Sequence, residues 1–453
     1  MNLLKLEDIA IKGGGRILGT PINLKVKGIS IDSRTLEKGE LFLALTGPSF
    51  DGHDFLKEAL KKGASSFVVE KTVELKNPYI LVKDSHKFLH NLAKKMRQEF
   101  KGNLVGITGS NGKTSTKEII FSFLSTEGIC HKTMGNRNNQ IGVPLSLSSL
   151  NQDFLFSVIE IGTSFIGEIK KLSKLVRPNV ALITNASESH LEGLGTIERV
   201  VEEKGSILDG LKEDGIAILP RDSAFFNVWS KKARGKKIVS FGFHKDSQIL
   251  LRNLKVDDIN KNLNFEINYE KEKIKCQMKG IGIHSALNAC SAFAVAYALG
   301  FDLEKLSPKL SSLNLPERRL SMHKSLKDSI LIDDSYNANP ESMKRSLDVM
   351  LNIGSKRRIF VAGEMKELGN EEELLHKMIC KYAYKKVDEF LCVGELWEGG
   401  LKYLHEKGRH FDSKLDLLEY LEERVNSDTV IMVKGSRSTG MDFIADKIKV
   451  KEC

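Results

Sequence analysis

The sequence predicts an α/β protein of three domains, in which a central P-loop-type, mostly parallel sheet is flanked by a small N-terminal α/β domain and a C-terminal Rossmann-like domain. Three observations predict this fold class. The chain of 453 residues is too long for a single core. Apolar strand patterns alternate with helical patterns along most of it. A glycine-rich loop ending in Gly-Lys-Thr joins one strand to a helix. We expect domains at 1–84, 85–312 and 313–453.

The N-terminal unit consists of short apolar runs that predict strands, with one helical segment between them. The strands cover 28–31, 41–45, 66–69 and 79–82, and the helix covers 54–62. Two polar clusters follow strand ends: one contains Ser33 and Arg34, and the other is the loop that runs from Thr46 and Gly47 to His53. Arg contacts phosphate with two N–H groups, so both clusters suit an anionic ligand. Ordinary turn chemistry explains them equally well.

The central unit reads as a doubly wound parallel sheet, because its strands are continuous apolar runs of the kind that is covered on both faces. The strands cover 103–105, 156–161, 180–184 and 216–219, and helices cover 86–100, 115–124 and 197–208. Residues 248–278 alternate apolar and charged side chains, which predicts half-exposed antiparallel strands attached to the sheet. Residues 283–299 form a helix of small residues that should pack closely.

The third unit alternates strands with amphipathic helices and has polar residues where three of its strands end. The strands cover 330–333, 358–362, 389–393 and 429–433, and the polar ends cover 334–340, 363–365 and 434–437. Ligands of open α/β sheets bind at the carboxyl ends of the strands. The sequence therefore predicts a site at that edge.

The loop before the helix at 115–124 is a predicted phosphate cradle. Its glycines let backbone N–H groups close around phosphate oxygens, and the helix N-terminus adds partial positive charge. Lys113 supplies a cation, and the Thr114 hydroxyl can reach Mg²⁺. The general pattern G-x-x-x-x-G-K-[ST] requires glycine at 107, where this chain has Ile107, with Gly106 one place earlier. The alternative is an ordinary glycine turn.

Four further features are candidates for chemistry. Glu160 ends a strand that should lie beside the P-loop strand, where a carboxylate can hold Mg²⁺ or cap the next turn. His190 follows the next strand and by itself is an ordinary loop residue. Lys204 lies within a helix, and the pattern alone favours a solvated lysine. The loop 135–144 is rich in amide and guanidinium donors, which suits a polar, anionic substrate or an Asn-rich turn.

Composition limits the class of partner and the compartment. The net charge of +10 comes from Lys and Arg scattered among acids, without a basic run interleaved with aromatics, so we favour anionic small substrates and expect no nucleic acid. The six cysteines form no C-x-x-C pair, which favours a reducing compartment. We see no signal-peptide pattern and no apolar run near 18 residues, and so expect a cytoplasmic protein without stable membrane insertion.

In combination these motifs resemble the Mur ligases, the ATP-dependent amide-forming enzymes of peptidoglycan synthesis. The matching stretches fall in family order over all three units: 106–114, 136–139, 160–162, 190–193, Asn288, 334–340 and 434–436. Within the family, the stretches at 138–144, 333–340 and 361–369 are similar to the branch that adds D-alanyl-D-alanine to UDP-N-acetylmuramoyl-tripeptide.

The resemblance implies ATP and Mg²⁺ as cofactors and assigns residues to each. ATP would contact Gly109, Ser110, Asn111, Gly112, Lys113, Thr114, Ser115, Asn288, Arg319, Asp334 and Asn337. Mg²⁺ would be held by Thr114, Glu160, His190 and, if carbamylated, Lys204. Catalysis would rest on Lys113, Glu160, His190 and Lys204.

The resemblance also implies where the two substrates bind. The first domain would hold the UDP end, and the third domain would hold the incoming dipeptide. The substrate-binding residues would be Ser33, Arg34, Thr46, Gly47, Asn136, Arg137, Asn138, Asn139, Tyr336, Asn339, Lys434 and Ser436. The third domain would close over the second, and we expect a monomer.

Two other functions remain open at this point. One is a sibling enzyme, either another Mur ligase or a folylpolyglutamate-synthase-like enzyme, which would share the ATP loop and differ in its amine-binding domain. The other is a P-loop ATPase for transport or nucleic-acid remodelling, for which the net charge is the hint. Against the ATPase, no apolar run ending in Asp follows the loop in the way a Walker-B strand would. The diamino acid at the third position of the tripeptide stays undetermined.

Overall fold

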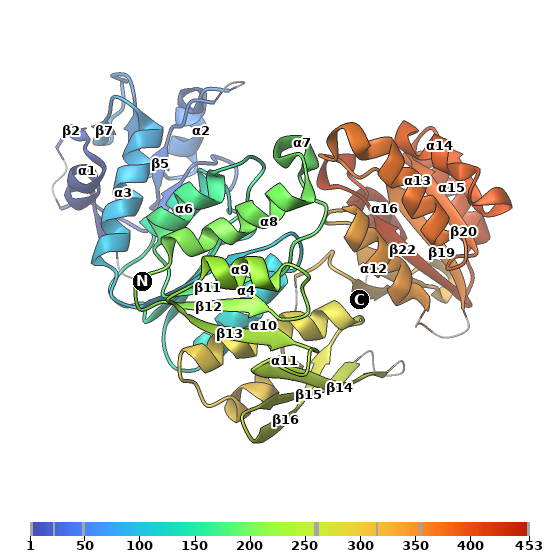
Figure 1. The fold of residues 1–453 in the computed structure, drawn as a ribbon. Helices are drawn as coiled ribbons and strands as arrows, with labels where there is room; N and C mark the ends of the chain where they lie inside the picture. Colours follow the sequence, from blue (N-terminus) through green and yellow to red (C-terminus); the bar gives the residue numbers. More distant parts are fainter. Residues whose placement is uncertain are drawn as a thin grey trace.

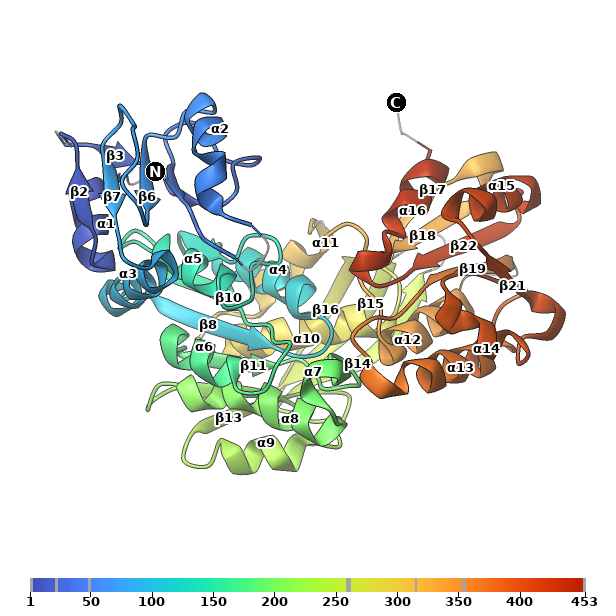
Figure 2. The same ribbon diagram turned by 90° about the horizontal axis from the view of Figure 1, so that it is seen from above.

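The computed structural model describes residues 3–20, 23–47, 50–257, 262–313, 316–351, 353 and 356–450. Of the features singled out in the sequence, Pro48 and Ser49 in the first-domain loop and Cys453 lie outside the described residues. The described chain forms three α/β units, and the first and third lie on opposite sides of the central one (Figures 1 and 2). This confirms the predicted fold class. None of the helices within these ranges is long and apolar enough to span a bilayer.

The N-terminal unit is a five-stranded sheet covered by helices on both faces. Its strands, in spatial order, are β2 (Arg16–Leu18), β7 (Tyr79–Leu81), β6 (Ser66–Val69), β5 (Leu41–Leu43) and β4 (Ile29–Ser30), all parallel except β2. Helices α1 (Leu6–Gly13) and α3 (Ser85–Glu99) pack on one face and α2 (Leu56–Lys61) on the other. β4 to β7 and α2 were predicted; α1, β2 and the small pair β1 (Leu4–Lys5) and β3 (Lys25–Val26) were not.

The first predicted domain boundary lies just before helix α3, which packs against two units. Helix α3 buries Phe88, Leu89 and Leu92 in the core of the N-terminal unit, while Ala93 packs in the core of the central unit. The boundary at residue 84 therefore stays a prediction, as does the one at residue 312.

The central unit contains a nine-stranded mixed sheet with helices on both faces. Its order is β16 (Glu272–Lys279), β15 (Asn262–Tyr269), β14 (Ile249–Asp257), β13 (Lys237–Gly242), β12 (Ile216–Pro220), β11 (Val180–Ile183), β8 (Asn103–Thr108), β10 (Phe156–Glu160) and β9 (Cys130–Lys132). Neighbours from β9 to β14 pair in parallel, and β14, β15 and β16 pair antiparallel. The parallel sheet and its antiparallel extension are both as predicted.

Two apolar cores sandwich this sheet. On one face lie α4 (Lys113–Leu124), α10 (Ile283–Ala298) and α11 (Ser307–Ser311). On the other lie α5 (Gly142–Ser148), α6 (Glu168–Val176), α8 (Ile197–Gly205) and α9 (Phe226–Lys232). A short helix, α7 (Leu191–Leu194), precedes α8 and points toward the third unit (Figure 1). Because β8, β10 and β11 are adjacent and parallel, the loops that follow them meet at one edge.

The C-terminal unit is an open sheet in the order β17 (Ser321–Lys324), β18 (Ile330–Asp334), β22 (Thr429–Lys434), β19 (Arg357–Gly363), β20 (Glu389–Val393) and β21 (Gly408–Phe411). All but β17 are parallel. Helices α12 (Pro340–Leu351), α13 (Glu372–Ala383) and α14 (Glu398–Leu401) cover one face, and α15 (Lys414–Arg424) and α16 (Asp442–Ile448) cover the other. The carboxyl ends of β18 and β22 carry Asp334 and Lys434, as the polar strand ends predicted.

Candidate functional site

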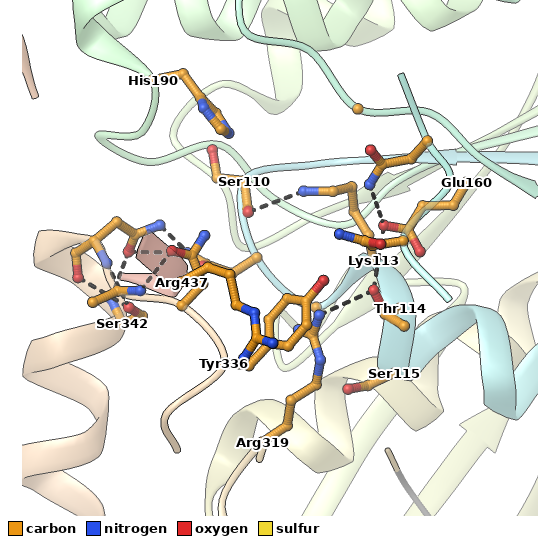
Figure 3. A pocket seen from close by; sticks show the side chains of 18 of the residues that line it. Ser110, Lys113, Thr114, Ser115, Glu160, His190, Arg319, Tyr336, Ser342 and Arg437 are labelled. Atoms are coloured by element: carbon orange, nitrogen blue, oxygen red, sulfur yellow. Dashed lines mark hydrogen bonds between the residues drawn. The ribbon is translucent and has the colours of Figure 1, made fainter. Parts of the chain in front are cut away.

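A cavity of about 510 Å³ lies where the strand ends of the central unit face those of the third unit. Most of the predicted site residues line it (Figure 3). These are Ser110, Asn111, Gly112, Lys113, Thr114, Ser115, Asn136, Asn138, Asn139, Glu160, His190, Asn288, Arg319, Asp334, Tyr336, Asn337, Asn339 and Lys434. Residues from five segments of the central unit and three of the third unit, far apart in sequence, therefore share one space.

The phosphate loop is held in a conformation that requires glycine at two positions. Gly109 and Gly112 have φ values of 150° and 82°, in the region that side chains disfavour. A Cβ at Gly112 would lie 2.5 Å from the Asn288 amide oxygen. The loop is also tied to the end of β11, because the Asn111 N–H donates to the Asn185 side-chain oxygen at 3.0 Å. The conformation of the loop therefore depends on glycine at both positions and on its contact with Asn185.

The off-pattern glycine has a simple structural explanation. Strand β8 continues to Thr108, so Ile107 is a fully buried core residue and Gly106 is a strand residue beside Pro178. The sequence-based strand, which ended at residue 105, was too short. Gly106 therefore belongs to the strand, and the turn of the loop begins only at Gly109.

Lys113 and Thr114 present their polar atoms to the cavity at the start of α4. The Lys113 ammonium donates to the carbonyl oxygens of Gly109 at 2.6 Å and Ser110 at 3.2 Å. Burial lowers the pKa of Lys113, although the nearby Glu160 carboxylate opposes this. The Thr114 hydroxyl donates to Glu160 at 3.3 Å and lies 3.1 Å from the Arg319 guanidinium, as Figure 3 shows.

Glu160 is a buried carboxylate with one unsatisfied oxygen. It ends β10 opposite Ile107 of β8, as predicted, and is 1% exposed. Its Oε1 accepts from the Asn138 amide at 2.8 Å, whereas its buried Oε2 has no hydrogen-bond partner among the described residues. Within those residues neither oxygen accepts a backbone N–H, so the turn-capping alternative is wrong. A buried, unsatisfied carboxylate oxygen facing a phosphate loop fits a cation.

Lys117, which the sequence analysis did not single out, does not line the cavity but contacts Glu160, which does. It lies one helical turn after Lys113, and its side chain is fully buried. Its ammonium donates to the Gly135 carbonyl at 2.8 Å and forms ion pairs with Glu118 at 3.4 Å and with the Oε2 of Glu160 at 3.7 Å. The i, i+4 spacing of two lysines at the start of α4 was the available signal.

Replacing Lys117 with methionine is expected to lower the free energy of unfolding by about 3 kcal/mol, because it leaves buried carboxylate charge without its cation. Urea unfolding measures this. Lys132→Met is the matched control, since Lys132 also pairs with Glu118 but is partly exposed, and we expect a loss below about 1 kcal/mol. Equal losses of unfolding free energy in the two variants would contradict the role of Lys117 as the buried cation of these carboxylates.

Lys204 is buried, which contradicts the solvated lysine that the pattern favoured. It lies near the C-terminus of α8 with no exposed surface, and its Nζ has no hydrogen-bond partner within the described chain. Burial lowers the pKa of Lys204 well below its usual value, and the positive charge of Lys113 adds to the effect. Lys204 does not line the cavity directly.

His190 lies at the start of α7 with its ring on the cavity side (Figure 3). Its Nδ1 contacts the carboxylate of Glu367 from the third unit. Burial lowers the pKa of His190, while the Glu367 carboxylate opposes this. Glu367 was not predicted as a site residue, and neither was His284, whose pKa burial lowers to about 4 and which lines the same cavity.

The Asn-rich loop shows the predicted turn chemistry, and its predicted contact with substrate stays a prediction. Asn138 holds Glu160, whereas the Asn139 side chain accepts from the Gly142 N–H at 2.8 Å and so shapes the turn into α5. Asn136 and Asn139 also line the cavity, but Arg137 does not.

In the third unit several predicted ligand contacts are made within the protein. The Lys434 ammonium donates to Asp334 at 2.5 Å and to the Asn337 carbonyl at 2.9 Å. Ser436 is buried outside the cavity lining, where its hydroxyl accepts from the Lys366 N–H. Besides the contacts of Glu367, two side chains of the third unit reach the phosphate loop: Asn339 donates to Asn111 at 3.0 Å, and Arg319, whose guanidinium stacks on Tyr336 at 3.9 Å, reaches Thr114.

The first-domain clusters do not line this cavity. Arg34 directs both prongs of its guanidinium at Asp32, with contacts of 2.9 and 2.8 Å, and its side chain is exposed. Ser33 is buried, and the Thr46 carbonyl oxygen contacts the His86 ring. At Gly47 a Cβ would lie 2.7 Å from the Phe50 ring. Their predicted contact with a UDP group stays a prediction.

Three family models match consecutive parts of the chain. The model for "Mur ligase family, catalytic domain" matches residues 25–97, that for "Mur ligase middle domain" matches 107–296, and that for "Mur ligase, glutamate ligase domain" matches 318–437. The three models follow the three structural units.

Curated relatives match over nearly their whole length. The UDP-N-acetylmuramoyl-tripeptide--D-alanyl-D-alanine ligase of Bacillus subtilis (strain 168) is 35% identical over 442 residues, covering 92% of each chain. The enzyme of the same name from Escherichia coli (strain K12) is 33% identical over 448 residues, covering 98% of this chain and 97% of that one.

Solved structures match over all three units. A crystal structure of MurF from Acinetobacter baumannii has a TM-score of 0.88 at 27% identity and covers 99% of both chains. MurF from Thermotoga maritima in complex with ADP has a TM-score of 0.79 at 28% identity, covering 93% of this chain and 96% of that one. A folylpolyglutamate synthase of Mycobacterium tuberculosis, at 14% identity and a TM-score of 0.63, shares the fold alone.

Proposed function

The chain belongs to the Mur ligase family, and we propose that it is the ATP-dependent ligase that joins D-alanyl-D-alanine to UDP-N-acetylmuramoyl-tripeptide in peptidoglycan precursor synthesis. The observation that carries the proposal is that relatives named for this activity match from the first unit through the third. The third unit is where sibling ligases with other amines should differ. The phosphate loop that faces this unit across the cavity supports the use of ATP.

The reaction requires that a carboxylate become a good acyl donor. Transfer of the ATP γ-phosphoryl group to the tripeptide carboxylate gives an acyl phosphate, which the amine of D-alanyl-D-alanine attacks to give the amide and release phosphate. Lys113 offsets the negative charge that accumulates on the transferred group. Its present partners are two backbone carbonyls, so its ammonium can turn to phosphate without breaking an ion pair.

Arg319 and Asn339 bring the third domain to the phosphate loop, where they contact Thr114 and Asn111. Such contacts would exclude water from the acyl phosphate and bring the dipeptide amine within reach. The proposed dipeptide contacts are at Tyr336, Asn339, Lys434 and the neighbouring Ser436. Ser33, Arg34, Thr46 and Gly47 are proposed for the UDP end of the other substrate.

We infer that Mg²⁺ binds beside the phosphate loop. The Oε2 of Glu160, which has no hydrogen-bond donor among the described residues and only the Lys117 ammonium at 3.7 Å, and the Thr114 hydroxyl are oxygen ligands of the kind this ion prefers; His190 and a carbamylated Lys204 would add to them. No group of three His, Cys, Asp or Glu side chains forms a complete metal cage in the described ranges. That suits Mg²⁺, which keeps several waters and shares phosphate oxygens. When bound, the ion would neutralise charge on the phosphates.

Lys204 is expected to act as a carbamate. Its amine is buried and unpartnered, and burial lowers its pKa well below the usual value, which favours the neutral amine that adds CO₂ to form a carbamic acid. Depleting CO₂ and bicarbonate should then reduce kcat by about 10-fold or more, the scale of losing a supporting metal contact. Initial rates with and without added bicarbonate measure this. Lys204→Gln should show no bicarbonate response, and a wild-type rate that ignores bicarbonate would contradict the carbamate.

The activity itself is tested by phosphate release from ATP in the presence of UDP-N-acetylmuramoyl-tripeptide, with and without D-alanyl-D-alanine. We expect sustained turnover only with both substrates. Turnover that ignores the dipeptide would refute the proposal and favour a P-loop ATPase. We further propose that the enzyme is a cytoplasmic monomer that needs no nucleic-acid partner.

A further inference from the structure

Glu367 joins the third domain to the loop that carries His190. It follows β19, and its carboxylate contacts the Nδ1 of His190. Its carbonyl oxygen accepts from the Glu192 N–H at 3.1 Å, and the neighbouring Leu368 is buried beside Leu191. The contact is therefore anchored by backbone and apolar packing and not by the two side chains alone.

The backbone on both sides of this contact is in an unusual conformation. His190 has φ = 54° and Glu367 has φ = 64°, in the left-handed region that residues other than glycine seldom occupy. Such conformations persist where the surrounding structure fixes them. Here they turn the imidazole of one domain toward the carboxylate of the other.

The Glu367 contact gives the two ring nitrogens of His190 different roles. A carboxylate at Nδ1 accepts the N–H of that nitrogen, which leaves the lone pair on Nε2. The ring is on the cavity side, and Nε2 has no hydrogen-bond partner among the described residues. The arrangement therefore presents Nε2 as an acceptor or ligand atom next to the phosphate loop.

We propose that Glu367 is a positioning residue that holds His190 in the Nδ1–H tautomer, so that Nε2 faces the cavity only while the third domain is docked. The identity of the group that Nε2 then meets, Mg²⁺ or its bound phosphates, rests on the proposed function. The tautomer and its dependence on Glu367 do not. Through the Glu367–His190 contact, the orientation of His190 in the site depends on the position of the third domain.

The tautomer is tested without substrate by ¹⁵N NMR of histidine-labelled protein. Comparison with His190→Ala assigns the signal of His190. We expect the wild type to show Nδ1 protonated, Glu367→Ala to lose this preference, and Glu367→Gln, which keeps an acceptor oxygen, to retain it. Glu371→Ala, an exposed carboxylate in the next turn, is the matched control and should leave the signal unchanged. An unaltered His190 signal in Glu367→Ala would overturn the proposal.

Calorimetry of ADP binding in Mg²⁺ and in EDTA tests the link to the site. Glu367→Ala should weaken Mg²⁺-dependent binding about tenfold and leave binding in EDTA nearly unchanged. In the His190→Ala background the same substitution should have no further effect. Independent, additive losses would show that Glu367 acts by another route and overturn the proposal. If the NMR result holds but the enzyme forms no amide bond, the proposed function fails while this inference stands.

Discussion

Lys113→Ala is expected to reduce kcat about 10³-fold, the scale of removing one charge-stabilising group from a phosphoryl- or acyl-transfer site. The loss should appear mainly in kcat, because the charge on the transferred phosphoryl oxygens develops after ATP has bound. Amide formation followed by chromatography under saturating substrates measures it.

The same substitution should leave stability unchanged. Among the described residues the Lys113 ammonium donates hydrogen bonds only to the carbonyl oxygens of Gly109 and Ser110 within its own loop, and burial lowers its pKa, so we expect it to add little to stability. Thermal unfolding of Lys113→Ala checks this. Retained activity would remove the phosphate loop from the mechanism, and a large loss of stability would show that the loss of rate reflects unfolding.

Glu160→Gln is expected to lower kcat/KM by about 10²-fold at fixed Mg²⁺. The hydrogen bond from Asn138 remains, but the anionic oxygen ligand of the ion is lost. The amide keeps the shape of the carboxylate and one oxygen for the Asn138 contact. Raising the Mg²⁺ concentration should recover part of the loss by mass action.

The control for this variant is Asn138→Ala, which leaves the carboxylate in place and removes only the donor to Oε1. We expect a smaller loss and a smaller shift in the Mg²⁺ midpoint. A Glu160→Gln enzyme whose Mg²⁺ dependence equals that of the wild type would exclude Glu160 as a metal ligand.

Local sequence was sufficient for the parts of the fold that local physics decides. Continuous apolar runs predicted the strand before the phosphate loop and its two neighbours β10 and β11. The loop glycines indicated a backbone conformation with positive φ, which Gly109 and Gly112 adopt. Alternation of apolar and charged residues predicted the antiparallel extension β14 to β16. Short elements such as α1 and β17 lack enough residues for a period to show.

The environment of single charged residues could not be predicted in the same way. Lys204 and Lys117 lie on helices whose sequence looks half-polar, and only the packing of other elements over them makes them buried. Arg34 looked free to bind phosphate, yet its guanidinium is engaged by Asp32. The contact of Glu367 with His190 joins residues 177 positions apart. Burial and partnership of this kind are set by tertiary structure.

The family resemblance singled out a residue that its position in the helix pattern did not. It singled out Lys204, which the helix pattern alone assigned to solvent, and the burial of this lysine is consistent with that choice. It did not single out Lys117 or Glu367, since neither was part of the residues carried over. Lys117 and Glu367 were identified only from their contacts with Glu160 and His190 in the structure.

Helix α7 has a mechanical consequence for any motion of the third domain. Leu191, Leu194 and Val200 belong to the central unit but are buried in the same apolar cluster as Met365 and Leu368 of the third. Separating the units would expose this surface at a cost of about 25 cal/mol per Å². Any separation of the third domain from the central one would therefore have to break this apolar contact together with the Glu367–His190 contact beside it.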